Sequence, residues 1–294
     1  MNPRRPWLHM EPLLAVLLWG GVYPGAKLGL QEIPVVRFTA LRILVAVVVL
    51  WAVSWRGQPW RLPPVLWPTL LAAGLAQTAF QGLLMAGLRW TTAGNSAILL
   101  ATAPLLTAGW LALRGRARLS RHQWLGLVLG LGGVGFVLHG SGLAFTWSQL
   151  HGDLLSLGAA VAWTWYSLAI GPLVGALGPV RATGWTMLVA AGGFVPLALG
   201  EIQAHVWQQV SWRAWAGLLY GATAGMVLAM TLWGKAVQRL GAQQTMLYVY
   251  LEPVTAVVIA AVVLGEAVAP LQVVGALCTL AGVGLASAPP QQAS

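Results

Sequence analysis

Few polar side chains interrupt the long apolar stretches of this sequence, and these few are the candidates for chemistry. Glu252 is the acidic residue that lies deepest in an apolar stretch, and Gln244 and Tyr248 precede it at helical spacing. A carboxylate placed there could exchange a proton or pair with an ammonium group. A structural role is the alternative, because Glu252 precedes Pro253 and could satisfy donors where the proline disturbs a helix.

Aromatic and amide side chains form a second group of candidates. Trp19 and Tyr23 are four residues apart and share a helix face, opposite a glycine stripe that suits close helix packing. These two rings either line a cavity or contact lipid. Gln77 and Gln81 lie one turn apart in another apolar stretch, where two amides need partners. They either bind polar groups of a substrate or join neighbouring helices by hydrogen bonds.

The second half of the sequence supplies counterparts of these residues. Trp163 follows Trp19 by 144 residues and shares a helix face with Ser167, so it could form the other wall of a pocket. Asn95 and Gln244 correspond at an offset of 149 residues. Rings for stacking and amides for polar ends would suit an amino acid, and an aromatic one in particular.

Other kinds of chemistry find little support in the sequence. The five histidines fall at or near the ends of apolar stretches, and Cys278 is the single cysteine, so we expect neither a metal site nor an intramolecular disulfide. A phosphate-binding P-loop is not apparent, which argues against ATP-driven transport by this chain alone. We therefore expect no cofactor and no enzymatic activity.

The composition places these residues in a membrane. Of the 294 residues, 58% are hydrophobic and 7% are charged, whereas soluble domains carry about 25% charged residues. The apolar residues form continuous blocks of about 20, the length of a transmembrane helix, and not the alternation of a β-barrel. The sequence predicts an all-α integral membrane protein with the lipid bilayer as its surroundings.

Ten transmembrane helices are predicted from these blocks. The connections between them are short, so no soluble domain is expected. The ten predicted spans cover residues 12–30, 35–54, 65–88, 93–113, 122–139, 153–172, 182–200, 213–234, 242–264 and 270–287.

The loops between the spans predict their orientation. With the N-terminus in the cytoplasm, eleven Lys and Arg residues fall on the cytoplasmic side and four on the other side, in agreement with the positive-inside rule. Both termini are therefore predicted to be cytoplasmic. This distribution explains most of the formal net charge of +10 without nucleic acid as a partner.

An internal duplication divides the chain into two five-helix repeats, at about residues 12–140 and 153–287. Residues 133–135 and 282–284 share the sequence Gly-Val-Gly at an offset of 149. Because five is odd, the second repeat would cross the membrane in the opposite direction to the first. Inverted repeats are typical of secondary transporters, whose two halves share a site near the midplane.

Two prolines occupy corresponding places in the repeats. Pro104 lies in the predicted span 93–113 and Pro253 in the span 242–264. Proline removes a backbone hydrogen bond and kinks a helix. We predict that the two kinks act as paired hinges, with a static bend as the alternative.

Short motifs recur through the chain in a characteristic order. The first half contains Trp19-Gly20, then Arg-Trp-Thr-Thr-Ala at 89–93, then Pro104; the second contains Gln-Arg-Leu-Gly-Ala at 238–242, Leu-Glu-Pro-Val at 251–254, and Leu-Gly-Glu at 264–266. Over nearly the whole chain, this pattern resembles the EamA domain of the drug/metabolite transporter superfamily. The resemblance implies a ten-helix exporter or permease of small metabolites in a bacterial inner membrane. YddG-type exporters of aromatic amino acids are the members it resembles most.

Together, these features predict a secondary transporter that exports small metabolites, with amino acids as the expected substrates, by alternating access around a central cavity. One alternative is an exporter of drugs or other amphiphiles, which would use the same aromatic walls without selecting zwitterions. Another is an integral membrane enzyme that acts on lipid-linked substrates. A monomer would suffice for transport, because the two halves are already fused in one chain.

Overall fold

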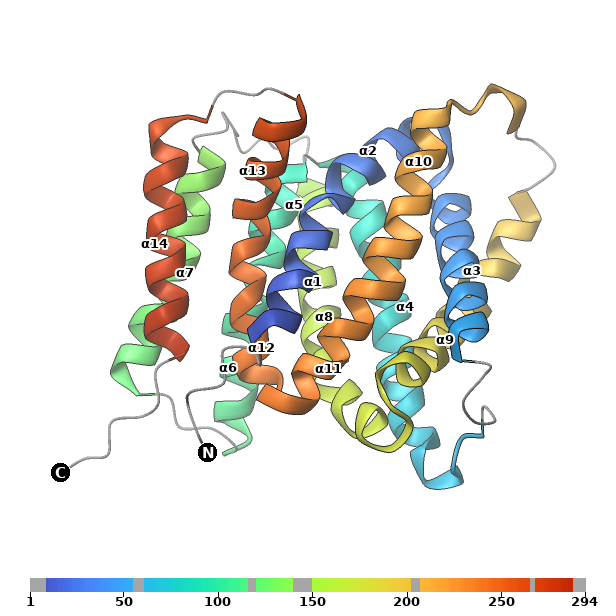
Figure 1. Ribbon diagram of the computed structural model, residues 1–294, viewed down its shortest axis with the longest axis horizontal. Coiled ribbons are helices and arrows are strands. Elements are labelled where there is room, and N and C mark those ends of the chain that lie inside the picture. Colours follow the sequence, from blue (N-terminus) through green and yellow to red (C-terminus); the bar gives the residue numbers. More distant parts are fainter. Residues whose placement is uncertain are drawn as a thin grey trace.

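The computed structural model describes residues 9–54, 61–91, 93–115, 120–139, 150–201, 207–264 and 268–287. The regular structure within these ranges is helical, as the sequence predicted, and most helices run along one bundle (Figure 1). Helices suit an apolar environment because each satisfies its own backbone N–H and C=O groups.

Seven α-helices make up the first half of the described chain. A short 3₁₀ turn, Pro64–Leu66, precedes the fourth of them. The helices are α1 (Met10–Gly20), α2 (Val22–Glu32), α3 (Val35–Ser54), α4 (Trp67–Trp90), α5 (Ala93–Leu100), α6 (Ala103–Leu113) and α7 (Arg121–His139).

The second half of the described chain begins with two long helices, α8 (Leu150–Leu177) and α9 (Pro179–Glu201). A 3₁₀ turn, Trp207–Gln209, follows them. A π-helical segment, Gly221–Ala229, then joins α10 to α11, and a 3₁₀ turn, Leu247–Tyr250, joins α12 to α13. The remaining helices are α10 (Trp212–Tyr220), α11 (Met230–Leu240), α12 (Ala242–Met246), α13 (Leu251–Leu264) and α14 (Pro270–Ser287).

Several of these helical stretches have the length and composition to cross a membrane. In the described part of the chain, six qualify fully: Met10–Glu32, Val35–Ser54, Pro64–Trp90, Leu150–Leu177, Pro179–Leu199 and Trp212–Leu240. Ala103–Leu113 and Pro270–Ala286 are shorter apolar helices. Large apolar side chains such as Leu75 and Leu277 are about three-fifths exposed on the outside of the bundle, which suits contact with lipid.

The stretches that contain Pro104 and Pro253 are interrupted helices. Residues 101–102 separate α5 from α6, and Pro104 then lies in the first turn of α6. Pro253 lies in the first turn of α13, directly after the 3₁₀ turn. A proline at a helix start gives up little, because the first N–H groups of a helix have no intrahelical partner. Each proline therefore begins the second part of a broken helix and does not bend a continuous one, which differs from the kink that the sequence suggested.

The main helix–helix contacts join one half of the chain to the other. α7 packs along α14, α4 along α8, α3 along α9 and α2 along α10 (Figure 1). Glycines allow α7 and α14 to approach closely. A Cβ on Gly282 would lie 2.4 Å from the backbone nitrogen of Gly130, and one on Gly133 would lie 2.7 Å from the carbonyl oxygen of Gly275. A larger residue at either position would force these two helices apart.

Candidate functional site

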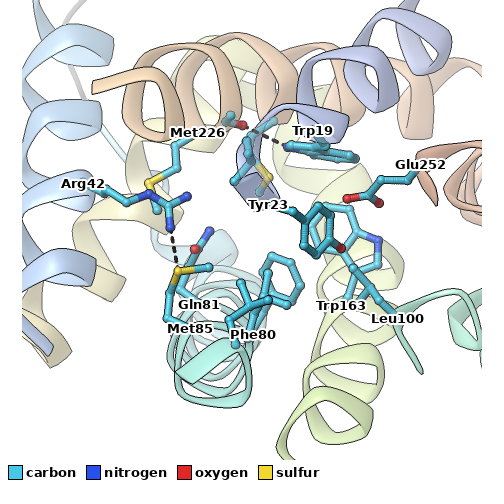
Figure 2. Close-up of a pocket in the computed structure, with 15 residues that line it drawn as sticks. Trp19, Tyr23, Arg42, Phe80, Gln81, Met85, Leu100, Trp163, Met226 and Glu252 are labelled. Carbon is cyan, nitrogen blue, oxygen red and sulfur yellow. Dashed lines mark hydrogen bonds between the residues drawn. The ribbon is translucent and has the colours of Figure 1, made fainter. Parts of the chain in front are cut away.

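A pocket lies where helices from both halves of the chain meet (Figure 2). Its volume is about 40 Å³, which leaves space for water-sized molecules. Sites for small molecules usually have volumes of several hundred Å³. The pocket is therefore too small for an amino acid in this conformation and would have to widen to admit one. Its lining includes Trp19, Tyr23, Phe80, Gln81, Trp163 and Glu252.

The break between α1 and α2 positions the first two of these side chains. Trp19 lies at the end of α1, and its Nε1 donates a hydrogen bond of 3.1 Å to the carbonyl oxygen of Gly225. Gly225 belongs to the π-helical segment, and such segments are frequent at functional sites. Tyr23 follows at the start of α2, two residues beyond Gly21, and its side chain is buried.

Four aromatic rings form one wall of the pocket and the layer behind it. The rings of Trp19 and Trp163 meet edge to face, with 5.1 Å between their centroids, and Phe80 lies 4.8 Å from Trp163. Trp233 stands behind them at 5.2 Å from both indoles. Its Nε1 donates a hydrogen bond of 3.0 Å to Oγ of Ser167. Edge contacts of this kind stabilise each other and hold the rings in a fixed arrangement.

Glu252 brings a carboxyl group to this aromatic wall. It lies in the first turn of α13 and is 6% exposed. Tyr23 is a neighbour close enough to interact with it electrostatically, although the Tyr23 hydroxyl makes no hydrogen bond of good geometry. No basic side chain within the described ranges forms an ion pair with Glu252. A carboxyl group so placed can exchange a proton or receive a cation.

Arg42 also lines the pocket, although it is not among the residues proposed from the sequence. It lies in the interior of α3, is 3% exposed, and donates a hydrogen bond from Nη1 to the sulfur atom of Met85 at 3.0 Å. The signal that could have identified it is simple. A charged residue in the middle of an apolar stretch is costly and therefore usually functional.

Known proteins resemble this chain over both of its halves. Residues 10–139 match the model of the EamA-like transporter family, and residues 150–288 match the same model again. This chain belongs to the EamA-like transporter family. It is therefore a transporter of the drug/metabolite superfamily and a multi-pass membrane protein, in agreement with its apolar helices.

The relatives of this EamA-like transporter are named as transporters. An uncharacterized transporter of Synechocystis sp. is 26% identical, over 91% of this chain and 86% of the relative. An uncharacterized transporter of Archaeoglobus fulgidus is 27% identical, over 97% of this chain and 98% of the relative. A protein of Streptantibioticus cattleyicolor named "Probable terminal-alkyne amino-acid exporter" is also 27% identical, over 93% and 91%. A crystal structure with 20% identity has the same fold, with a TM-score of 0.78 over 96% of this chain and 97% of that one.

The EamA-like transporter brings together five residues that the sequence proposed for its site. Trp19, Tyr23, Gln81, Trp163 and Glu252 all line the pocket. Their role in substrate binding stays a prediction.

Ser167 and Gln77 lie outside the pocket lining. Ser167 supports Trp233 from behind the aromatic wall. Gln77 is fully buried between α4 and α9, where its Nε2 lies 3.8 Å from the sulfur atom of Met187. This placement favours the helix-joining role over the substrate-binding role for Gln77. The side chain of Asn95 lies outside the described residues.

The expected common face of Gln244, Tyr248 and Glu252 is absent from the structure. Gln244 is exposed, and Tyr248 is buried away from the pocket with its hydroxyl bonded to Nδ1 of His9. The cause is the 3₁₀ turn between α12 and α13. Three residues per turn in place of 3.6 add about 80° of rotation over four residues, so Gln244 and Glu252 face different directions.

Potential metal ligands are not concentrated at this site. The described residues contain no group of three or more His, Cys, Asp and Glu side chains that could hold a metal ion.

Proposed function

We propose that this EamA-like transporter is a secondary transporter that exports amino acids, aromatic ones among them, across a bacterial inner membrane. The observation that carries the proposal is the pocket, because its buried aromatic wall and its polar groups come from both halves of the chain. Aromatic rings provide apolar contact area for a side chain, and the polar groups suit the ends of an amino acid. The relative named as an amino-acid exporter supports the same substrate class.

The helix contacts support two inverted five-helix repeats, with ten spans in all, at residues 12–140 and 153–287. Gly126 corresponds to Gly275 in the repeat, and Gly133 corresponds to Gly282. A Cβ on Gly126 would lie 2.7 Å from the carbonyl oxygen of Gly282, and one on Gly133 would lie 2.7 Å from that of Gly275. Exchange of the two halves converts one contact into the other, as a two-fold axis between antiparallel helices would require.

Alternating access would then widen the pocket toward one side of the membrane at a time. The interrupted helices that begin again near Pro104 and Pro253 are the proposed hinges, since transporters commonly build their sites from such discontinuous helices. The start of α1 and the end of α14 point toward the same edge of the bundle (Figure 1). This agrees with the proposal that both termini are cytoplasmic, for which the distribution of basic residues is the basis.

Flux measurements in liposomes test the proposed function. The purified chain is reconstituted, and release of labelled aromatic and aliphatic amino acids is followed with and without a pH gradient. We expect release of unchanged amino acid that exceeds the release from protein-free liposomes. No movement of any amino acid would overturn the proposal, whereas movement of amphiphilic cations alone would favour a drug exporter. Chemical conversion of lipid-linked substrates would indicate an enzyme.

The pH gradient tests whether Glu252 couples transport to protons. If Glu252 couples transport to protons, an imposed pH gradient should drive amino-acid release by the wild-type protein. The same gradient should have no effect on release by Glu252→Gln. A gradient that has the same effect on both proteins would remove the coupling role. Uniport would appear as release that follows the amino-acid gradient alone.

A further inference from the structure

Two buried ionisable side chains, one basic and one acidic, lie on opposite sides of the pocket. Figure 2 places Arg42 on one side and Glu252 on the other, with Tyr23 and the aromatic rings between them and around them. Arg42 comes from α3 in the first half of the chain, and Glu252 comes from α13 in the second. The pocket therefore has a basic end and an acidic end.

The contacts of Arg42 leave its charge unmatched. Nη1 donates to the thioether of Met85, which is a weak acceptor, and the guanidinium lies 5.5 Å from the centroid of the Phe38 ring. Its Nε is buried without a hydrogen-bond partner. None of the acidic side chains in the described ranges forms an ion pair with it. The guanidinium is held in place and has donors to offer.

The π-helical segment makes room for Arg42 at this place. A Cβ on Gly221 would lie 2.7 Å from Nε of Arg42, so only glycine allows the guanidinium to lie against this backbone. The same segment accepts the hydrogen bond of Trp19 at Gly225. One irregular segment thus positions the basic end of the pocket and one part of its aromatic wall.

Burial of one charged side chain in a membrane has a high free-energy cost, and burial of two charges that do not pair with each other has a higher one. A ligand that carries both a carboxylate and an ammonium group could neutralise the two side chains together. Guanidinium is suited to a carboxylate because its planar fork can donate two parallel hydrogen bonds. A carboxylate such as that of Glu252 is the natural partner of an ammonium group.

We propose that Arg42 binds the carboxylate of an amino-acid substrate and Glu252 binds its ammonium group, while its side chain packs against Trp19, Phe80 and Trp163. This inference rests on the proposed function, amino-acid export, and assigns to it the residues that select a zwitterion. Selection follows because a ligand with only one charged group leaves the opposite buried charge unpaired. Loss of one hydrogen bond to a charged group typically weakens binding about 10- to 100-fold.

Three related ligands test this assignment. L-phenylalanine carries both charged groups, phenethylamine lacks the carboxylate, and 3-phenylpropionate lacks the ammonium group. Binding to the purified full-length chain is measured as the ligand-induced rise in unfolding temperature, so that a variant that no longer transports can still be examined. For the wild-type protein, we expect each of the two singly charged ligands to bind about 10- to 100-fold more weakly than L-phenylalanine.

The two variants should then differ in a crossed manner. Arg42→Gln should bind L-phenylalanine and 3-phenylpropionate about 10- to 100-fold more weakly, and should leave phenethylamine unaffected. Glu252→Gln should weaken L-phenylalanine and phenethylamine, and should leave 3-phenylpropionate unaffected. Arg37→Gln is the matched control, since Arg37 is a second buried arginine of α3 that lies outside the pocket lining. It should preserve the wild-type order of the three ligands.

The outcomes separate this inference from the proposed function. Equal binding of all three ligands by the wild-type protein overturns the zwitterion assignment, even if amino acids are exported. Equal weakening of all three ligands by Arg42→Gln and Glu252→Gln overturns it as well. If a charge-removing variant fails to fold, the wild-type comparison still decides, and Arg42→Lys and Glu252→Asp should keep the wild-type order. Failure of the wild-type protein to move any amino acid in liposomes overturns the proposed function and this assignment with it.

Discussion

Replacement of Gly282 by alanine should separate α14 from α7 and lower the stability of the protein. The added Cβ would lie 2.4 Å from the nitrogen of Gly130, 2.6 Å from its Cα, and 2.7 Å from the carbonyl oxygen of Gly126. Carbon atoms pack at about 3.5–4.0 Å, so α14 must move by about 1 Å. Backbone atoms cannot rotate away as a flexible side chain can, and the contact must therefore be relieved by the whole helix.

The expected loss follows from two opposing effects. Overpacking in a well-packed interface costs about 1–3 kcal/mol. Alanine offsets up to about 1 kcal/mol of this, because it favours the helix more than glycine does. We expect a net decrease of about 1–2 kcal/mol in the free energy of unfolding. Unfolding of the detergent-solubilised protein, followed by circular dichroism, measures this decrease as a lower midpoint.

The chain offers a matched control and a symmetric counterpart. A Cβ on Gly284, two residues further along α14, meets nothing within 4 Å, so Gly284→Ala should be neutral or stabilising by up to about 1 kcal/mol. In the repeat, Gly133 corresponds to Gly282 and Gly135 corresponds to Gly284. Gly133 is again crowded by backbone, whereas Gly135 is open. Gly133→Ala should therefore destabilise and Gly135→Ala should not. Equal destabilisation by Gly282→Ala and Gly284→Ala would refute the packing argument.

Three further predictions concern ion pairing, ring contact and hinge motion. Glu11→Gln should lower the free energy of unfolding by about 0.5–1 kcal/mol, because Glu11 pairs with Lys235 at 3.1 Å and with Arg239 at 2.5 Å. Both basic side chains are more than a third exposed, so the loss should become smaller at high salt. A loss that does not depend on salt would contradict this prediction. Trp19→Phe should lower the free energy of unfolding by about 1 kcal/mol, because it removes one hydrogen bond. It should also weaken the binding of aromatic amino acids more than the binding of alanine. Equal weakening of both would exclude a role of Trp19 in ring contact. Pro104→Ala and Pro253→Ala should slow transport while ligand binding is kept, and unchanged rates in both would remove the hinge role.

Much of the fold could be predicted from local patterns. Continuous apolar blocks require helices in a membrane, and the described helices follow the predicted spans closely, for example at residues 35–54, 122–139 and 270–287. The interruptions were harder to foresee. The π-helical segment of Gly221–Ala229 and the 3₁₀ turn of Leu247–Tyr250 have no distinct composition, because a change in helix type depends on the helices packed around it.

The candidate site was predicted in part. The offset between the repeats paired Trp19 with Trp163, and their rings are in contact. A charged side chain is costly to place inside a membrane, and this cost identified Glu252 as a candidate. Glu252 does line the pocket. The same cost in hydrocarbon applies to Arg42, which lies in the predicted span 35–54 but is not among the residues proposed from the sequence. The prediction that Gln244 shares a helix face with Glu252 is wrong, because it assumed α-helical spacing through a segment that is a 3₁₀ turn.

The sequence by itself determined the environment and the class of this protein. A charged fraction of 7%, blocks of about 20 apolar residues and two copies of one motif series are local or periodic properties, and no tertiary contact is needed to recognise them. They lead to a membrane transporter built from related halves.

Only the tertiary structure decided which of the buried polar groups face each other across one pocket. Arg42 and Glu252 are 210 residues apart in the chain and belong to different halves, so no local spacing relates them. Their arrangement results from the close packing of helices on small residues and from the irregular segments that turn side chains toward or away from the pocket. These contacts are properties of several helices at once, and they decided that the pocket has a basic end and an acidic end.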